Sequence, residues 1–340
     1  MRLVSLQKPD NLALRVPDWK PFPRERRSCP FCGYYSDPLF LRPDSLPIAQ
    51  CHRCHCFYVS LRVVDEALQK FYERYWSETW PRPLTDEMAR YLVSSAEKRA
   101  SADHCIRRLT ALVGAWKGAK VLDVGCGFGE KATMMKDLGA SVIGLDISAD
   151  AVKFMTEKLG IESYTSAIET WPDNGSFFDI VTMFEFIEHP LDPLRSLEAA
   201  VNRMKPGGLL AIVTPNGTAG DDETFPVSKN WIGFRVDLEH MQYLHVDTVD
   251  YLAHKLHCRV LHFEQFGFRP LDDISQGKRE AAFVHRRALR QFIKDIPGVR
   301  KAVYAFRDLQ MKRRAAAYPP LDAGIYHLFT ILQKQVCDRE

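Results

Sequence analysis

The residues best suited to chemistry lie in a glycine-rich turn that directly follows a short apolar run. Asp123 ends that run, and Gly125, Gly127 and Gly129 alternate with other residues before Glu130, where a helical pattern begins. Glycine permits positive φ and lets a ligand approach the backbone where a Cβ would clash. The dinucleotide fingerprint G-x-G-x-x-G is not met, because the third glycine comes one residue early. The turn therefore predicts a nucleotide-like ligand other than NAD.

A second carboxylate follows the glycine turn at the sequence spacing that is typical of a ribose-binding residue. Asp146 ends the apolar run 142–145, about 20 residues beyond the turn, and can pair with both ribose hydroxyls. The alternation of apolar runs and helical patterns predicts parallel strands joined by helices. Further strands are expected at 178–183, 209–213, 260–266 and 324–332, and helices at 148–159, 193–204 and 246–256.

The G-x-G-x-G turn with its preceding aspartate resembles motif I of the class I S-adenosylmethionine methyltransferases. Two later runs resemble the same superfamily, Phe184-Glu185-Phe186-Ile187-Glu188-His189 and Lys205-Pro206-Gly207-Gly208. The resemblance implies an α/β fold with a Rossmann-like seven-stranded sheet, whose last strand inserts antiparallel beside the sixth. It also implies S-adenosylmethionine as cofactor, held by Asp123, Gly125, Cys126, Gly127, Gly129, Asp146, Ile147, Ile168 and Phe184.

Four N-terminal cysteines have the spacing of a zinc ribbon. Cys29 and Cys32 form one C-x2-C pair, and Cys51 and Cys54 form another. Each pair makes a tight knuckle that presents two thiolates, and two knuckles close a tetrahedral site with no open position, so the zinc is expected to be structural. His52, His55 and Cys56 crowd the second knuckle and are alternative ligands. Nine cysteines, four of them in this pattern, fit a reducing cytoplasm and a metal better than disulfides.

The chain is expected to contain several parts around one catalytic core. These are an N-terminal arm (1–28), a zinc ribbon (29–60), a helical cap or linker (61–117) and the core (118–340), which carries a helical insertion at about 270–320. No apolar run is long enough for a membrane span, and the N-terminus lacks the apolar segment of a signal peptide. We therefore expect a cytoplasmic protein.

The expected insertion is strongly basic. Between Lys278 and Arg314 it holds twelve lysines or arginines against three acidic residues, whereas the whole chain has a net charge of only +3. Its apolar residues recur at helical intervals, which predicts basic amphipathic helices. Such a surface suits an anionic membrane or a lipid-linked substrate, which would make the protein peripheral to a membrane. It also suits a nucleotide-sugar phosphate, and nucleic acid less well. A charged face that is merely solvated is at least an equal alternative.

A narrower resemblance concerns the methyl acceptor. The ribbon, a tyrosine-bearing helix, His189 after the fourth strand and the pair Glu239-His240 after the fifth resemble zinc-bearing sugar methyltransferases. This implies methylation of a hydroxyl on a small polar molecule, a sugar or glycoconjugate. Carbon methylation of a sugar intermediate and an RNA methyltransferase with a zinc module are the alternatives. A non-catalytic cofactor-binding scaffold is disfavoured, because Asp123, the glycines and Asp146 are all present.

A hydroxyl acceptor must lose a proton, and a histidine with a pKa near neutrality suits that task. His240, oriented by Glu239, is the first candidate for the base, and His189 is the second. No second ligand cluster is visible in the sequence, so no catalytic metal is expected. Candidate substrate contacts lie in the aromatic helix and in the loop after the fifth strand, at Tyr75, Asn216, Trp231 and Tyr243.

Overall fold

The computed structural model describes residues 3–6, 19, 21–73, 75, 84–172, 175, 177–220, 232–235, 238–266 and 326–335. The chain divides into two compact units. One comprises Met1–Glu264 with Leu328–Glu340, and the other comprises Gln265–His327. The basic insertion expected between Lys278 and Arg314 falls in the second unit and lies outside the described residues.

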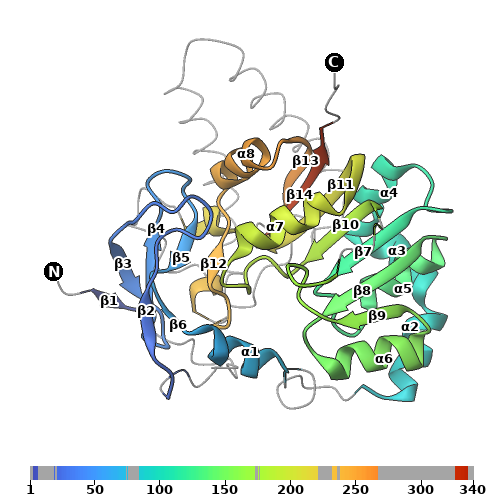
Figure 1. The fold of residues 1–340 in the computed structure, drawn as a ribbon, viewed down its shortest axis with the longest axis horizontal. Coiled ribbons are helices and arrows are strands. Elements are labelled where there is room, and N and C mark those ends of the chain that lie inside the picture. The colour runs from blue at the N-terminus through green and yellow to red at the C-terminus, as the bar shows by residue number, and fades with distance from the viewer. Residues whose placement is uncertain are drawn as a thin grey trace, which may run out of the picture. The chain divides into compact units, whose positions relative to one another are not determined.

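A seven-stranded sheet lies at the centre of the first unit, in the order β13-β14-β11-β10-β7-β8-β9 (Figure 1). Its strands are β7 (Lys120–Val124), β8 (Ser141–Asp146), β9 (Glu162–Thr165), β10 (Phe178–Phe184), β11 (Met204–Pro215), β13 (Cys258–Phe266) and β14 (His327–Lys334). Strands β7 to β11 pair in parallel. The predicted α/β sheet is thus confirmed, and the last strand lies beside the sixth as expected.

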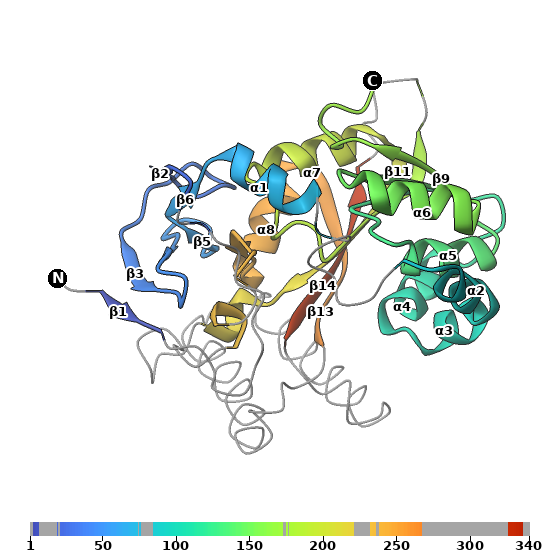
Figure 2. The same cartoon turned by 90° about the horizontal axis from the view of Figure 1, so that it is seen from below.

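Helices connect these strands and cover the sheet. They are α5 (Glu130–Asp137), α6 (Ala149–Leu159), α7 (Pro193–Asn202) and α8 (Val246–Lys255). Three earlier helices, α2 (Asp86–Ser94), α3 (Ala96–Ala102) and α4 (His104–Val113), pack against α5 and α6. Figure 2 shows α2 to α6 gathered on one side of the sheet and α7 and α8 on the other. Among the described residues, no helix has the length and apolar character needed to cross a membrane.

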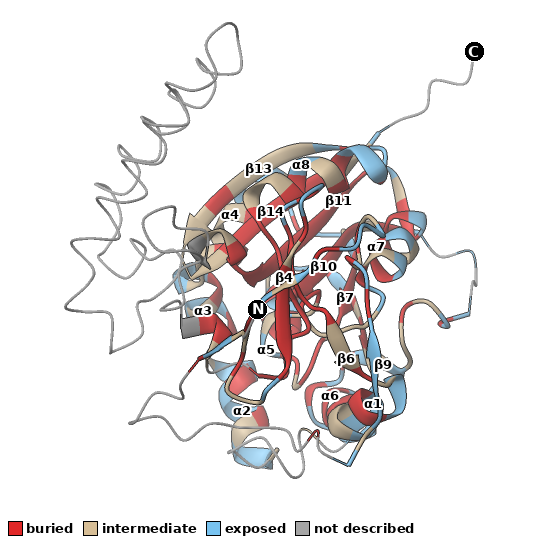
Figure 3. Ribbon diagram, turned by 90° about the vertical axis from the view of Figure 1, so that its left-hand side faces the viewer, coloured by how far each residue is buried: buried red, intermediate tan, exposed pale blue. Residues whose placement is uncertain are grey.

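A second sheet joins the N-terminal region to the core. Its five strands run in the order β1 (Val4–Ser5), β3 (Pro38–Leu41), β4 (Pro47–Gln50), β5 (Phe57–Val59) and β12 (Gln242–Tyr243). Strand β12 belongs to the segment after β11 and pairs antiparallel with β5. Figure 3 shows that β4, like the central strands of the large sheet, is buried. A small pair, β2 (Arg24–Arg26) with β6 (Leu61–Val63), leads into α1 (Asp65–Glu73).

A buried arginine fastens the segment before β12 to the N-terminal sheet. The Arg42 side chain is inaccessible to solvent and forms an ion pair with Asp44 at 2.6 Å. Its Nη1 donates to the carbonyl of His240 at 2.5 Å, and its Nη2 donates to the carbonyl of Leu238 at 2.7 Å. A guanidinium satisfies several acceptors in one plane, so it can be buried where a lysine would leave acceptors unmatched. The backbone around His240 therefore depends on a residue of the N-terminal region.

A second polar cluster joins α4 to β13. The Glu264 carboxylate lies 2.8 Å from His104 Nε2, 3.0 Å from His262 Nε2 and 3.3 Å from Arg108 Nε. Burial on its own would raise the pKa of Glu264, but the hydrogen bonds and charges of His104 and His262 outweigh it and lower the pKa far below the ordinary value. The ionised carboxylate therefore stabilises the folded chain.

We expect Glu264→Gln to lower the free energy of unfolding by about 1–3 kcal/mol at pH 7, because a partly buried charge network loses its anion. A carboxyl whose folded pKa is depressed stabilises above its unfolded pKa of about 4.3, and this stabilisation is lost as the pH falls below that value. Denaturant unfolding from pH 7 to pH 3 should show the difference shrinking. The exposed Glu198→Gln is the control, and a difference independent of pH would contradict the assignment.

Candidate functional site

The glycine turn has the backbone conformation that its sequence predicts. Gly125, Gly127 and Gly129 have φ of 70°, 52° and 80°, and α5 begins at the next residue. A Cβ on Gly125 would lie 2.5 Å from a carbon of the Phe186 ring, which leaves no space for a side chain. The turn is thus held tightly against the segment after β10 and presents its backbone at the carboxyl ends of the strands, where ligands bind in such sheets.

Asp123 is a buried carboxylate at the end of β7. Burial raises its pKa to about 6, although a hydrogen bond from Thr182 (2.7 Å) and the charge of Lys131 oppose the shift. A charge in such surroundings is stabilised by a cationic partner. The ammonium of the methionine half of S-adenosylmethionine is such a partner, so this position fits the cofactor.

Asp146 ends the neighbouring strand, β8. Its two oxygens accept hydrogen bonds from the backbone N–H groups of Gly127 (2.9 Å) and Ser148 (2.8 Å), and burial raises its pKa. The adjacent Ile147 is 38% exposed, an apolar surface suited to a flat ring. The other expected cofactor contacts, Cys126, Ile168 and Phe184, are buried. These residues fit an adenosine with its ribose on Asp146.

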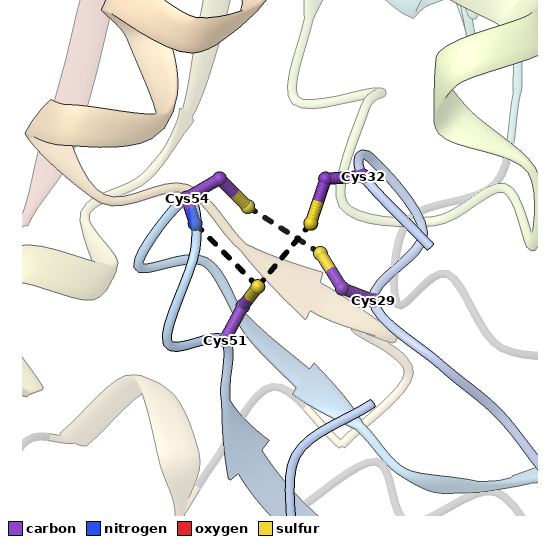
Figure 4. Close-up of side chains that lie close together, drawn as sticks. All are labelled: Cys29, Cys32, Cys51 and Cys54. Carbon is purple, nitrogen blue, oxygen red and sulfur yellow. Dashed lines mark hydrogen bonds between the residues drawn. The ribbon is translucent and has the colours of Figure 1, made fainter. Parts of the chain in front are cut away.

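The four expected zinc ligands converge (Figure 4). Cys29 Sγ lies 3.4 Å from Cys54 Sγ, and Cys32 Sγ lies 3.3 Å from Cys51 Sγ. A tetrahedral zinc with Zn–S bonds of about 2.3 Å separates its sulfurs by roughly 3.8 Å, so a small expansion would admit the ion. The arrangement is compatible with a zinc ribbon. The alternative ligands His52 and His55 are exposed and do not belong to the cluster.

Both candidate histidines lie in a second cluster, beyond the carboxyl end of β10. The rings of His189 and His240 are 4.8 Å apart, centroid to centroid. The hydroxyl of Tyr72, on α1, lies 2.6 Å from His189 Nδ1. Burial lowers the pKa of His189 to about 4 and raises that of Tyr72, so both groups are neutral at pH 7. The sequence predicts a substrate contact at Tyr75 in this aromatic helix, but not the contact between Tyr72 and His189.

A buried carboxylate that we did not predict as a site residue, Glu188, lies near both histidines. Ligating atoms of Glu188, His189 and His240 all lie within 4.8 Å of one another. The expectation of no second ligand cluster is therefore wrong: Glu188 and His240 are distant in sequence and meet only in the fold. Glu239, expected to orient His240, is also buried, and its carbonyl lies 3.5 Å from the Tyr72 hydroxyl. The E-x-x-E-H run at the end of β10 was the available signal.

Of the four expected substrate contacts, the structure places one, Tyr75, beside the histidines. Tyr243 is buried in β12, its hydroxyl accepts from Arg42 at 3.1 Å and its ring packs on Phe234. Asn216 is also buried, and its side-chain oxygen accepts from the backbone of Thr218. Both therefore support local structure. Tyr75 packs against the Phe71 and Tyr72 rings beside the histidines, whereas Trp231 lies outside the described residues.

Comparison with known proteins gives a consistent family. Residues 95–262 match a family model described as "Methyltransferase domain". A Ubiquinone biosynthesis O-methyltransferase of Chelativorans sp. is 34% identical over 108 residues, covering 30% of this chain and 43% of that protein. One of Dinoroseobacter shibae is 31% identical over 168 residues, covering 46% and 65%. A SAM-dependent methyltransferase structure from Archaeoglobus fulgidus aligns with TM-score 0.44 and 22% identity, covering 67% and 92%.

The matches thus span roughly half the length of those two curated relatives. Both relatives are named as O-methyltransferases of ubiquinone biosynthesis, which does not agree with the acceptor that we expected from the sequence. The expectation of a sugar or glycoconjugate, with its alternatives of sugar carbon methylation and RNA methylation, is therefore wrong. What the fold, the glycine turn and the family match establish together is that residues 95–262 form a methyltransferase domain of the class I S-adenosylmethionine-dependent superfamily.

Proposed function

We propose that this protein transfers the methyl group of S-adenosylmethionine to a hydroxyl on an apolar, ring-bearing acceptor of the kind that quinone biosynthesis uses. The observation that carries the proposal is the partly buried cluster of Tyr72, Glu188, His189 and His240 beyond β10, in which Glu188 and His240 are buried. Glu188 and His189 follow β10, and Asp123 and Asp146 lie at the ends of β7 and β8, so these residues meet at the same edge of the parallel sheet.

The surroundings of this cluster favour an apolar acceptor. The Tyr72 ring packs on His189 and on Phe71 and Tyr75, and the His240 ring lies 6.0 Å from that of Tyr243. A polyhydroxylated acceptor requires many polar partners, since each unpaired hydroxyl costs binding free energy. Aromatic side chains instead match a flat ring whose single hydroxyl meets the histidines.

Methyl transfer is an in-line displacement, so positioning supplies much of the rate. The acceptor O–H bond must also break. His240 is our first candidate for the group that promotes this step, and His189 is the second, because their rings meet edge to face and both lie beside Glu188. The cluster contributes this proton transfer, and the turn and strand-end carboxylates hold the cofactor.

We expect Asp146→Ala to weaken binding of S-adenosylhomocysteine by roughly 1.5–3 kcal/mol, the cost of losing charge-assisted hydrogen bonds to the ribose. Isothermal calorimetry on the purified protein measures it. Asp150→Ala, an exposed acidic residue in the first turn of α6, is the matched control and should bind normally. Equal affinity in the two variants would remove Asp146 from the cofactor site.

We also propose one structural zinc held by Cys29, Cys32, Cys51 and Cys54. Elemental analysis should find one zinc per chain that a thiol-blocking reagent releases, because thiolates are its ligands. Replacement of Cys29 and Cys32 by serine should abolish this zinc, whereas Cys105→Ser, a buried cysteine outside the cluster, should retain it. Thiol-releasable zinc that persists in the double variant would refute the ribbon.

For the acceptor side, we expect His240→Ala to lower turnover by about 10² to 10⁴ while leaving cofactor affinity nearly intact, since the group acts on the acceptor proton. Glu239→Gln should have a smaller effect. The exposed His254→Ala on α8 is the control. Turnover is followed as methyl transfer to simple ring hydroxyls. Unchanged turnover in His240→Ala would show that His240 does not promote loss of the acceptor proton. His189 would then be the candidate, or positioning of the acceptor alone would be sufficient.

A further inference from the structure

The second cysteine pair lies in the loop of a β-hairpin. Strand β4 ends at Gln50, directly before Cys51, and β5 begins at Phe57, which lies opposite Gln50 across the hairpin. The backbone N–H of Cys51 donates to the carbonyl of Cys56 at 2.9 Å and closes the loop. The conformation of this hairpin loop is therefore tied to the two thiolates that it presents to the zinc site.

The other edge of β5 pairs with the segment that carries His240. In the antiparallel pair of β5 and β12, Gln242 lies opposite Tyr58, and the backbone N–H of Val59 donates to the carbonyl of Met241 at 2.9 Å. His240 directly precedes these residues. The position of this candidate for proton transfer therefore depends on the hairpin that the cysteine loop closes.

A buried threonine joins the same cysteine pair to α8. Thr248 lies in the first turn of α8, and its hydroxyl donates to the carbonyl of Cys54 at 2.8 Å. The same hydroxyl accepts from the backbone N–H of His245, the N-cap residue of the helix, at 3.2 Å. Residues 238–248 are thus attached to the hairpin through β12 and to the cysteine pair through α8.

The turn after β10, residues 187–191, is attached to the N-terminal region as well. Arg27, which precedes the first cysteine pair, donates to the carbonyl of Leu191 at 2.6 Å and to the side-chain oxygen of Gln242 at 2.9 Å. The amide nitrogen of Gln242 in turn donates to the carbonyl of Ile187 at 2.6 Å. Both segments that carry the candidate histidines are therefore fixed by contacts with the N-terminal region.

The cofactor carboxylates take their hydrogen bonds from the core instead. Asp146 accepts from the backbone of Gly127 and Ser148, and Asp123 accepts from the hydroxyl of Thr182. These five residues lie on β7, β8 and β10 or in the turns that directly follow β7 and β8. The positions of the two carboxylates are therefore set by contacts within the methyltransferase core.

We propose that zinc binding at the four cysteines orders the acceptor side of the site and leaves the cofactor side unaffected. The sulfurs of the four cysteines lie within 4.8 Å of one another, so without an ion their thiolates repel and the hairpin loop opens. The pairing of β5 with β12 and the bond from Thr248 then loosen. The inference rests on the proposed function, which places the acceptor at the histidines.

The coupling is reciprocal, as thermodynamic linkage requires. If zinc holds residues 238–248 in place, the contacts that attach those residues to the hairpin also strengthen zinc binding. The bond from the Thr248 hydroxyl to the Cys54 carbonyl is the contact that joins the two most directly. Its removal should therefore lower the affinity for zinc, although Thr248 is not a ligand.

The first test compares the full chain with zinc bound and after zinc removal by a strong chelator under reducing conditions. Hydrogen exchange is followed by mass spectrometry in peptides covering residues 187–191 and 238–248, with residues 120–146 as the internal reference. Zinc removal should accelerate exchange of the first two at least about 10-fold, and leave the reference and the affinity for S-adenosylhomocysteine within about 3-fold. Added Zn²⁺ should restore slow exchange.

The second test measures zinc affinity by competition with a chromogenic chelator. Thr248→Val removes the donor to the Cys54 carbonyl and should weaken zinc binding about 2- to 10-fold, the effect of one hydrogen bond. Thr248→Ser keeps the hydroxyl and should bind zinc as the wild type does. Thr156→Val, at an exposed position of α6, is the matched control and should also bind zinc normally.

Calorimetry with S-adenosylhomocysteine separates the possible failures. Equal exchange with and without zinc overturns the coupling, and so does unchanged zinc affinity in Thr248→Val. Loss of S-adenosylhomocysteine binding on zinc removal also overturns it, because zinc would then stabilise the whole fold. If Thr248→Val itself fails to bind S-adenosylhomocysteine, it is misfolded and the exchange comparison decides. A zinc-loaded wild-type chain that does not bind S-adenosylhomocysteine contradicts the methyltransferase proposal, whereas one that binds it but takes up no zinc overturns the coupling alone.

Discussion

The buried guanidinium of Arg42 is the contact on which the acceptor side depends. Its guanidinium donates hydrogen bonds to the buried carbonyls of Leu238 and His240. A second arginine, Arg27, donates to the carbonyl of Leu191 at 2.6 Å. Both arginines belong to the N-terminal region, whereas the carbonyls belong to the core. Removing either partner would leave buried polar groups unpaired, which costs more than the contact contributes. The cysteine region is thus part of the site's architecture.

Local sequence patterns predicted the cofactor-binding residues. The acceptor side depends on contacts between residues far apart in sequence, which local patterns do not reveal. The glycine turn, Asp123, Asp146 and the cysteine pairs each carry their signal within a few residues, so the sequence could show them. Strand β9 (Glu162–Thr165) went unpredicted because it is mostly exposed and has no apolar run. The pairing of β12 with β5 joins segments far apart in sequence, which no local pattern reveals.

The acceptor was the least predictable part for a physical reason. Its identity depends on loops, whose conformations follow from tertiary contacts, whereas the cofactor site follows from one turn and two strand ends. The pair Glu239-His240 suggested an acid–base couple, yet the fold brings Glu188 to His240 as well. The histidines and the Glu239-His240 pair, which resemble those of the sugar methyltransferases, therefore indicated where the acceptor binds but not which acceptor it is.

Strand β14 (His327–Lys334) lies between β13 and β11 in the interior of the large sheet, although the chain makes it after β13 and a long intervening segment. During synthesis β11 must therefore wait with an open edge, its backbone donors and acceptors unpaired, until the ribosome has produced β14. An open apolar edge recruits other strands. For that interval the edge of β11 is open to pairing with other strands, and the large sheet is complete only when β14 has been made.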